Sequence, residues 1–323
     1  MERSERAERA LRLRGHRERF SRLGWALTAQ MAAMLAVQTA LLLAAQALAV
    51  QTALLLADQA LAPALAGSGV FLWLVSVLSA YGAGVPAAWL VLRGTEEAPP
   101  QPGAPLGPGR FFRSYLAGLG LMYLVNLATL ALMGLVGLLR GQTVENPVDN
   151  MADYPLALSL LLGCVIAPVC EEYLFRGLLL NRLRPYGERF AVWASALCFG
   201  LFHGNFSQFF YACAIGVLFA GVVLKTGRLR QAMLLHALIN FVGTGLIPLL
   251  SGLVEAGDWL LTLLVLAAMF VGLAFLPAMR REFSPAPGWK GLTAGEAWRC
   301  FLGNPGMLCF LALFLLLAGS YLV

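Results

Sequence analysis

Apolar residues fall in long runs along the chain, and charged or Pro/Gly-rich breaks separate the runs. Most runs hold about 20 residues, enough for a helix to cross a hydrocarbon core of roughly 30 Å. The pattern predicts an all-α fold, a polytopic membrane helix bundle of about eight to nine transmembrane helices. The candidate spans lie near 24–57, 70–92, 114–139, 156–182, 189–204, 206–224, 231–250, 259–277 and 305–322.

The composition excludes a soluble globular protein. Hydrophobic residues make up 59% of the 323 positions and charged residues 12%, against roughly 45–50% and 25% in soluble domains. The net charge of +6 would suggest nucleic acid as a partner of a soluble protein. In a membrane protein the placement of Lys and Arg matters more than their sum. We therefore expect the lipid bilayer as a partner and no nucleic acid.

Lysine and arginine lie on alternate connections between the predicted spans. With a cytoplasmic N-terminus, the cytoplasmic connections are 93–113, 183–189, 225–230 and 278–300. The loops on the outer side hold one basic residue, Arg140. Cytoplasmic loops of membrane proteins carry an excess of Lys and Arg. This asymmetry predicts a multi-pass integral membrane protein with a cytoplasmic N-terminus, and we expect the bacterial inner membrane as its location.

Changes in composition divide the chain into five segments. The first 22 residues hold eight Arg and four Glu, and GTEEAPPQPGAPLGPG is a Pro/Gly-rich stretch without helical periodicity. The predicted segments are a basic cytoplasmic arm (1–22), accessory N-terminal membrane helices (23–93), a Pro/Gly linker (94–109), a catalytic membrane core (110–250, with its motifs in 155–250) and C-terminal accessory helices (251–323).

One stretch of 13 residues is duplicated. Residues 36–48 recur as 49–61, with Ala45 replaced by Asp58 as the one difference. The insertion adds roughly 20 Å of helix at 1.5 Å per residue. The first helix is therefore expected to be too long for the bilayer and to tilt, kink or protrude, and we expect no direct catalytic role for the duplication.

Few ionisable groups lie inside the predicted spans. Each costs about 2.5–3.5 kcal/mol on insertion, so each is a candidate functional residue. Glu171 and Glu172 are adjacent and, at about 100° per residue, point in different directions. Glu172 and Arg176 are spaced i,i+4 and can pair on one helix face. Glu171 is left as an unpaired carboxylate, suited to act as a general base.

Two histidines and an asparagine complete the set. His236 and Asn240 are also spaced i,i+4, and His203 lies near the end of its span. A carboxylate, two imidazoles and an amide can activate water and stabilise a tetrahedral intermediate of amide hydrolysis. No Ser or Cys is evidently paired with a His, which disfavours a nucleophilic-residue protease. A Glu–Arg pair taken alone is more often a fastener between helices.

The motifs EEYLFRG, FGLFH and LLHALINF, in this order, resemble the EExxxR, FxxxH and HxxxN motifs of the CPBP family of CAAX-protease and bacteriocin-processing intramembrane endopeptidases. The resemblance covers roughly 155–250. It implies a glutamate-dependent hydrolase in which Glu171 is the base, His203 and His236 assist it, and Asn240 supports the oxyanion. Glu172 and Arg176 would form a supporting pair.

The resulting prediction is an intramembrane endopeptidase that hydrolyses a peptide bond near the C-terminus of a membrane-associated protein or peptide. Three substrates stay open: a prenylated CAAX protein, a bacteriocin-like peptide and a C-terminal sorting segment. A non-catalytic membrane binding or bacteriocin-immunity protein of the same fold is the alternative. A transporter is disfavoured, because the two halves of the chain hold no matched pair of broken helices.

A cofactor is not favoured. A divalent metal such as zinc would need three protein ligands, and Glu171, His203 and His236 could supply them. Glu171 cannot easily serve both as a ligand and as a free base. The depths of the three groups also differ: counted at 1.5 Å per residue from the predicted cytoplasmic helix ends, they are about 16–20, 22 and 9 Å, respectively.

Overall fold

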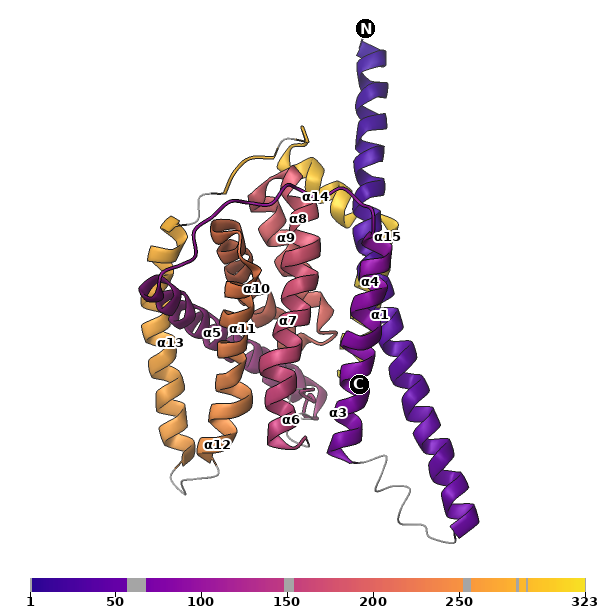
Figure 1. Cartoon of the computed structure of the whole chain (residues 1–323), viewed down its shortest axis with the longest axis vertical. Helices are drawn as coiled ribbons and strands as arrows, with labels where there is room; N and C mark the ends of the chain where they lie inside the picture. Colours follow the sequence, from indigo (N-terminus) through magenta and orange to yellow (C-terminus); the bar gives the residue numbers. More distant parts are fainter. Residues whose placement is uncertain are drawn as a thin grey trace.

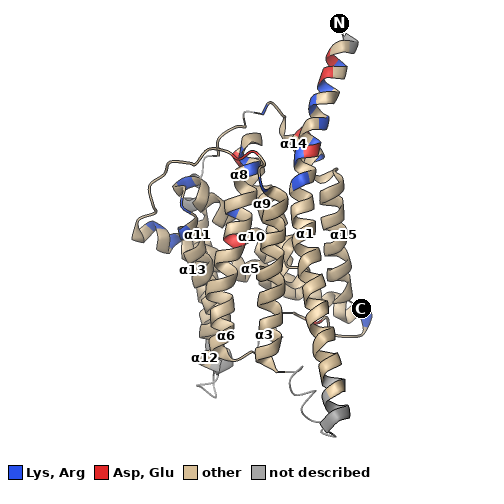
Figure 2. Ribbon diagram, turned by 45° about the vertical axis from the view of Figure 1, so that its right-hand side comes forward, with Lys and Arg blue, Asp and Glu red and all other residues tan. Residues whose placement is uncertain are grey.

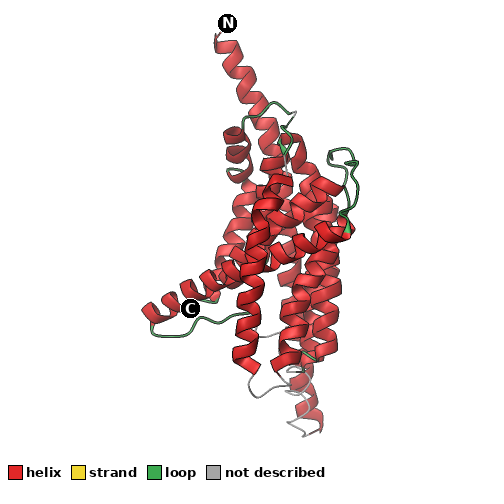
Figure 3. Cartoon of the chain, turned by 90° about the vertical axis from the view of Figure 1, so that its left-hand side faces the viewer, coloured by secondary structure: helices red, strands yellow, loops and turns green. Residues whose placement is uncertain are grey.

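The chain folds into a bundle made of helices. The computed structural model describes residues 2–56, 68–147, 154–251, 257–282, 285–288 and 290–322. Within these ranges every regular element is a helix and no strand occurs (Figure 3). The predicted all-α membrane bundle is confirmed.

The α-helices, long and short, largely follow the apolar runs. They are α1 (Glu2–Leu56), α3 (Gly69–Val77), α4 (Val85–Leu92), α5 (Pro108–Arg140), α6 (Leu156–Leu161), α7 (Ala167–Glu172), α8 (Leu180–Leu183), α9 (Glu188–Phe202), α10 (Phe206–Thr226), α11 (Leu229–Phe241), α12 (Ile247–Ser251), α13 (Gly257–Glu282), α14 (Ala294–Leu302) and α15 (Pro305–Ser320). Wider π-helical turns join several of them: η1 (Leu78–Gly84), η3 (Leu162–Ile166), η4 (Tyr173–Leu179) and η6 (Val242–Leu246), while η5 (Arg184–Tyr186) is a 3₁₀ turn.

Fewer helices than predicted are long enough to span a membrane. Six in the described part of the chain pass by length and apolar composition, or seven when α14 and α15, bent by 63°, count as one span. The sequence predicts eight to nine. The run at 189–204 forms α9, whose 15 residues reach about 22 Å and fall short of the roughly 30 Å hydrocarbon core. The run at 259–277 lies in α13, a helix of 26 residues, and Leu261–Pro277 is its apolar part.

Three of the wide turns end just before a proline. Pro86, Pro168 and Pro248 each stand two residues after η1, η3 and η6, respectively. Proline has no N–H, and its ring clashes with the carbonyl four residues earlier. A wider turn upstream relieves this clash and keeps the helix continuous. The helix before Pro168 therefore contains the π turn η3.

Helix α1 is one uninterrupted helix of 55 residues, about 80 Å long at 1.5 Å per residue. It projects beyond the bundle at its N-terminal end and diverges from α3 at the other end (Figure 1). The first copy of the duplication, 36–48, has mostly exposed or half-buried side chains. The end of the second copy, 57–61, lies outside the described residues. The predicted excess length of the first helix is confirmed.

The basic connections gather at one end of the bundle. Figure 2 shows Lys and Arg on the N-terminal arm and around the nearby ends of α8 and α11, with a further basic residue near the opposite end. The linker crosses this end: Ala98 N donates to Asn181 O, Arg184 donates to Pro99 O, and Leu106 N donates to the Gln231 side chain. The predicted cytoplasmic connections thus share one side, while the cytoplasmic N-terminus itself stays a prediction.

Candidate active site

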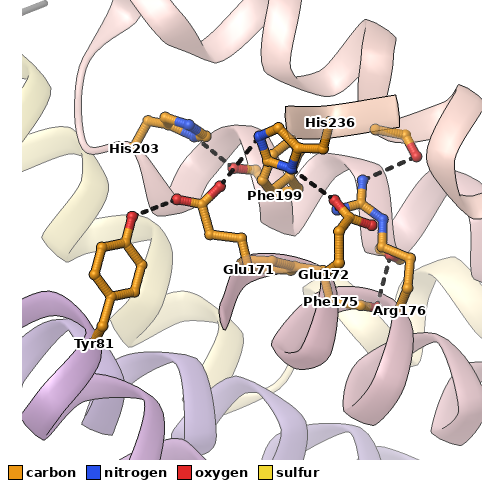
Figure 4. A network of polar contacts seen from close by, with 10 residues as sticks. Tyr81, Glu171, Glu172, Phe175, Arg176, Phe199, His203 and His236 are labelled. Carbon is orange, nitrogen blue, oxygen red and sulfur yellow. Dashed lines mark hydrogen bonds and ion pairs between the residues drawn. The ribbon is translucent and has the colours of Figure 1, made fainter. Parts of the chain in front are cut away.

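The two adjacent glutamates of the candidate site are the last two residues of α7. Both are buried, with 5% of Glu171 and none of Glu172 exposed. Their side chains diverge, as neighbouring positions on a helix must. Glu171 points into a cavity, whereas Glu172 points toward Arg176 and the interior of the bundle (Figure 4).

Glu172 and Arg176 form the predicted ion pair. Nη1 of Arg176 donates to Oε1 of Glu172 over 2.9 Å, and Nη2 donates to the carbonyl of Gly216 on α10 over 3.1 Å. The guanidinium carbon lies 4.4 Å from the ring centroid of Phe199 and 5.4 Å from that of Phe219. The charge is thus paired and covered by aromatic faces, an arrangement that a planar guanidinium suits.

His236 on α11 connects the two glutamates. Its Nδ1 lies 3.0 Å from Oε1 of Glu172, and its Nε2 lies 3.8 Å from Oε2 of Glu171. The ring stacks on Phe219 with 5.0 Å between centroids. A histidine that donates Nδ1–H to a carboxylate keeps Nε2 as an acceptor. Glu172 therefore serves two partners, His236 as well as Arg176, and the sequence predicts only the second.

His203 follows the last residue of α9 and lies on the other side of Phe199. Its Nδ1 is 2.9 Å from the carbonyl oxygen of Phe199, and the two rings meet edge to face at 5.1 Å. The next residue, Gly204, has φ +66°, a conformation that glycine adopts without strain. It lets the chain reverse into α10 directly behind the imidazole, which lines the same cavity as Glu171.

Asn240 lies one turn beyond His236 on α11, as its spacing predicts. Its Nδ2 donates to the carbonyl of Gly163 in η3 over 2.8 Å. An asparagine amide has two N–H donors, so this bond holds the amide in place and occupies one of them. Asn240 also lines the cavity.

The cavity separates the predicted site residues into two groups. It measures about 1020 Å³ and is bordered by the three turns that precede prolines, η1, η3 and η6. π-Helical turns are frequent at functional sites. Its walls include the four residues predicted as catalytic, which are Glu171, His203, His236 and Asn240. Glu172 and Arg176 lie behind this wall.

Glu171, His203 and His236 lie on one wall although they are different numbers of residues from their own helix ends. The reason is that these helix ends are staggered. Figure 1 shows α8 and α9 reaching farther toward the basic end of the bundle than α11. His236 is seven residues from the start of α11, while Glu171 lies fifteen residues before the end of η5. The predicted mismatch in depth is therefore wrong, since it measures each group from a different level.

One contact of the site comes from a residue that the sequence analysis missed. The hydroxyl of Tyr81 in η1 donates to Oε1 of Glu171 over 2.6 Å. Tyr81 lies in SAYGAG, a small-residue break just before Pro86 in an otherwise apolar span. A tyrosine in such a break is the one available signal, and it does not indicate which helix its hydroxyl meets.

The described residues hold no group of three or more His, Cys, Asp or Glu side chains arranged to bind a metal ion. Within the predicted ligand set, Glu171 Oε1 accepts from Tyr81 and His203 Nδ1 faces the Phe199 carbonyl.

Comparison with known proteins covers the part of the chain that holds the motifs. Residues 153–242 match the family model described as type II CAAX prenyl endopeptidase Rce1-like. The comparisons with curated proteins and with solved structures gave no match. The matched segment contains both glutamates, both histidines and Asn240. It agrees with the family resemblance of the three motifs and supports an intramembrane endopeptidase in general.

Proposed function

We propose that this protein is an intramembrane endopeptidase that cleaves a peptide bond near the C-terminus of a membrane-associated protein or peptide. The observation that carries the proposal is the cavity wall on which Glu171 and His236 lie with 3.8 Å between Oε2 and Nε2. A water molecule about 2.8 Å from each atom can lie beside the line that joins them.

Glu171 acts as the general base. Its carboxylate takes a proton from this water while the oxygen adds to the scissile carbonyl carbon, which forms the C–O bond of a tetrahedral intermediate. The intermediate then breaks its C–N bond, and the proton held by Glu171 passes to the leaving nitrogen. The products are a carboxyl group and an amine, so atoms and charges balance.

Asn240 stabilises the intermediate from the same wall. The second amide hydrogen of Asn240, which does not bind Gly163, is directed to the oxyanion, and fixed donors of this kind lower the barrier without reorganisation. His203 donates Nδ1–H to the carbonyl of Phe199, so its neutral ring keeps Nε2 as an acceptor that assists Glu171 in holding the attacking water. The Glu172–Arg176 pair holds His236 in the tautomer that leaves Nε2 free to accept from water.

The proposed reaction uses no metal ion, because Glu171 acts in it as the free base and cannot easily serve as a metal ligand as well. Residues 285–288, Lys290 and the linker lie over the basic end, which we place in the cytoplasm of a bacterial cell. A substrate anchored in the bilayer can approach the cavity sideways between helices. Prenylated CAAX proteins, bacteriocin-like peptides and C-terminal sorting segments all have such an anchor.

The proposal is tested by reconstituting the protein in liposomes with a panel of membrane-anchored peptides from these three classes. Wild-type protein is expected to cleave at least one class, with the products identified by mass spectrometry. Glu171→Ala and His236→Ala should each lower the rate about 10²–10⁴-fold, the usual contribution of acid–base groups. Glu18→Gln, at an exposed glutamate of the N-terminal arm, is the matched control.

Two results would overturn this mechanism. Equal cleavage by wild type, Glu171→Ala and His236→Ala would remove the roles given to these residues. Loss of activity with a chelator, reversed by added zinc, would replace the metal-free reaction. Absence of cleavage with every anchored peptide would favour the alternative of a non-catalytic binding protein.

A further inference from the structure

The second span of the chain, Gly69–Leu92, supplies part of the candidate active site. Tyr81 belongs to η1, which packs against α1 and α4, and it lies outside the segment 153–242 that matches the family model. Its hydroxyl nevertheless reaches Oε1 of Glu171, the oxygen that does not face His236. Figure 4 shows Tyr81 and His236 approaching the carboxylate of Glu171 from opposite sides.

The bond between these two side chains is short and has a defined direction. A phenol has one hydrogen and an ionised carboxylate can only accept, so Tyr81 is the donor. Their separation of 2.6 Å falls in the range of about 2.5–2.7 Å for O–H···O⁻ bonds, which are roughly twice as strong as neutral ones. The contact is thus suited to an ionised Glu171.

The backbone that carries Tyr81 is firmly held. Ser79 Oγ donates to the carbonyl of Val75 over 2.6 Å. Gly84 lies so close to α1 that a Cβ at this position would come within 2.9 Å of Nε2 of Gln30. The wide turn before Pro86 therefore packs directly on α1, which fixes the direction in which the Tyr81 side chain leaves the helix.

We propose that Tyr81 is a positioning residue for Glu171. By binding Oε1, it holds the carboxylate in the rotamer in which Oε2 faces Nε2 of His236 and the cavity. The inference rests on the proposed function, and it assigns the second span, Gly69–Leu92, a role in the reaction. Without the hydroxyl, the Glu171 side chain samples other rotamers. Its carboxylate is then less often in the position to take a proton from the water when substrate is bound.

Kinetics on a cleaved peptide test the role. Tyr81→Phe removes one oxygen and is expected to lower kcat about tenfold while KM stays within twofold, because the hydroxyl orients the base and does not bind substrate. Tyr173→Phe is the control: Tyr173 lies on the same helix run as Glu171, is 38% exposed and is absent from the cavity wall. A kcat of Tyr81→Phe equal to wild type would overturn the inference.

A spectroscopic measurement keeps the inference testable without turnover. Infrared difference spectra between wild type and Glu171→Gln identify the carboxylate band of Glu171. Tyr81→Phe is expected to shift that band, since the carboxylate loses its strongest donor. Tyr154→Phe, whose hydroxyl meets Ser76 Oγ elsewhere in the cavity over 2.9 Å, should leave the band in place. An unshifted band in Tyr81→Phe would overturn the inference.

The two failures are distinguishable. If wild type cleaves no peptide but the band shifts, the proposed function is wrong and the contact is real. If wild type cleaves, Glu171→Gln does not, and Tyr81→Phe cleaves at the wild-type rate, the function stands and the positioning role is wrong.

Discussion

Glu171 and Glu172 are neighbours in the chain, yet they lie in two different kinds of environment. Glu172 is enclosed: Arg176 and His236 donate to one of its oxygens, and none of its surface is exposed. Among the described residues, Glu171 accepts one short hydrogen bond, from Tyr81, and its other oxygen borders a cavity of about 1020 Å³.

This difference separates a residue that holds the structure from one that is free to react. A buried charge has to be paired, because an uncompensated one is strongly destabilising. Once Arg176 neutralises Glu172, the pair can fix the orientation of His236. Glu171 retains an oxygen that can accept a proton, as a base requires. One turn of helix therefore provides both the support and the reactive group.

The largest effect on stability is expected at the enclosed carboxylate. Glu172→Gln leaves the Arg176 charge buried without its counterion, which should lower the free energy of unfolding by about 3–5 kcal/mol. Glu171→Gln, at the cavity, should change it by less than about 1 kcal/mol. Unfolding of both variants in detergent, followed by circular dichroism, measures the difference. Equal destabilisation would show that the two environments are not distinct.

A double variant separates lost pairing from lost packing. Adding Arg176→Met to Glu172→Gln removes the orphaned charge, so the double variant is expected to be more stable than Glu172→Gln alone. A double variant less stable than the single one would mean that the guanidinium stabilises the bundle through its contacts with Phe199 and Phe219 and not mainly through Glu172.

A smaller effect is expected where α10 passes the guanidinium. A Cβ on Gly216 would lie 3.1 Å from Nη2 of Arg176 and 3.1 Å from Cα of Ala196. Gly216→Ala should therefore displace the guanidinium and lower the free energy of unfolding by about 1–2 kcal/mol. The disturbance reaches His236 through Glu172, so kcat on a cleaved peptide should fall a few-fold. Ala214→Gly, two residues away, is a control for the backbone change. A Gly216→Ala variant as stable as wild type would show that the space around the Glu172–Arg176 pair accommodates a methyl group.

The smallest effect is expected at a surface ion pair. Lys290 donates to Glu96, and this hydrogen bond lowers the pKa of the Glu96 carboxyl below its usual value of 4.5. Because the pKa is lowered in the folded state, the contribution is present above about pH 4.5 and is lost as the pH falls further. Glu96 is 56% exposed, so Lys290→Gln should cost less than about 1 kcal/mol at pH 7. Unfolding at pH 7 and pH 3 measures it. A larger loss, or one that persists at pH 3, would contradict a screened ion pair.

Much of the site is predictable because it is local. The i,i+4 spacing of Glu172 and Arg176 predicts their ion pair, and the scarcity of charges in apolar spans directs attention to His203 and His236. The same spacing places Asn240 beside His236. The two pairings depend on residues within one turn of a single helix, and the two histidines are found from the composition of the spans.

The remaining contacts depend on how helices pack, and here the sequence is insufficient. The contact between His236 and Glu172 joins α11 to α7, and that of Tyr81 with Glu171 joins η1 to α7. Neither follows from spacing along one helix. The run at 189–204 shows a related limit of the sequence: an apolar run predicts burial, and α9 is buried among other helices without being long enough to span a membrane.

The wide turn η3 sets the angular register of the glutamates. A π turn accommodates one more residue than the same length of α-helix, so everything after it is rotated by about 100° relative to α6. That is also the angle between Glu171 and Glu172. In an unbroken α-helix of the same sequence, Glu171 would therefore point where Glu172 points now, and Cys170 would take the direction that Glu171 has now. The choice of which glutamate meets the cavity is in this sense encoded upstream, by one inserted position and the proline that follows it.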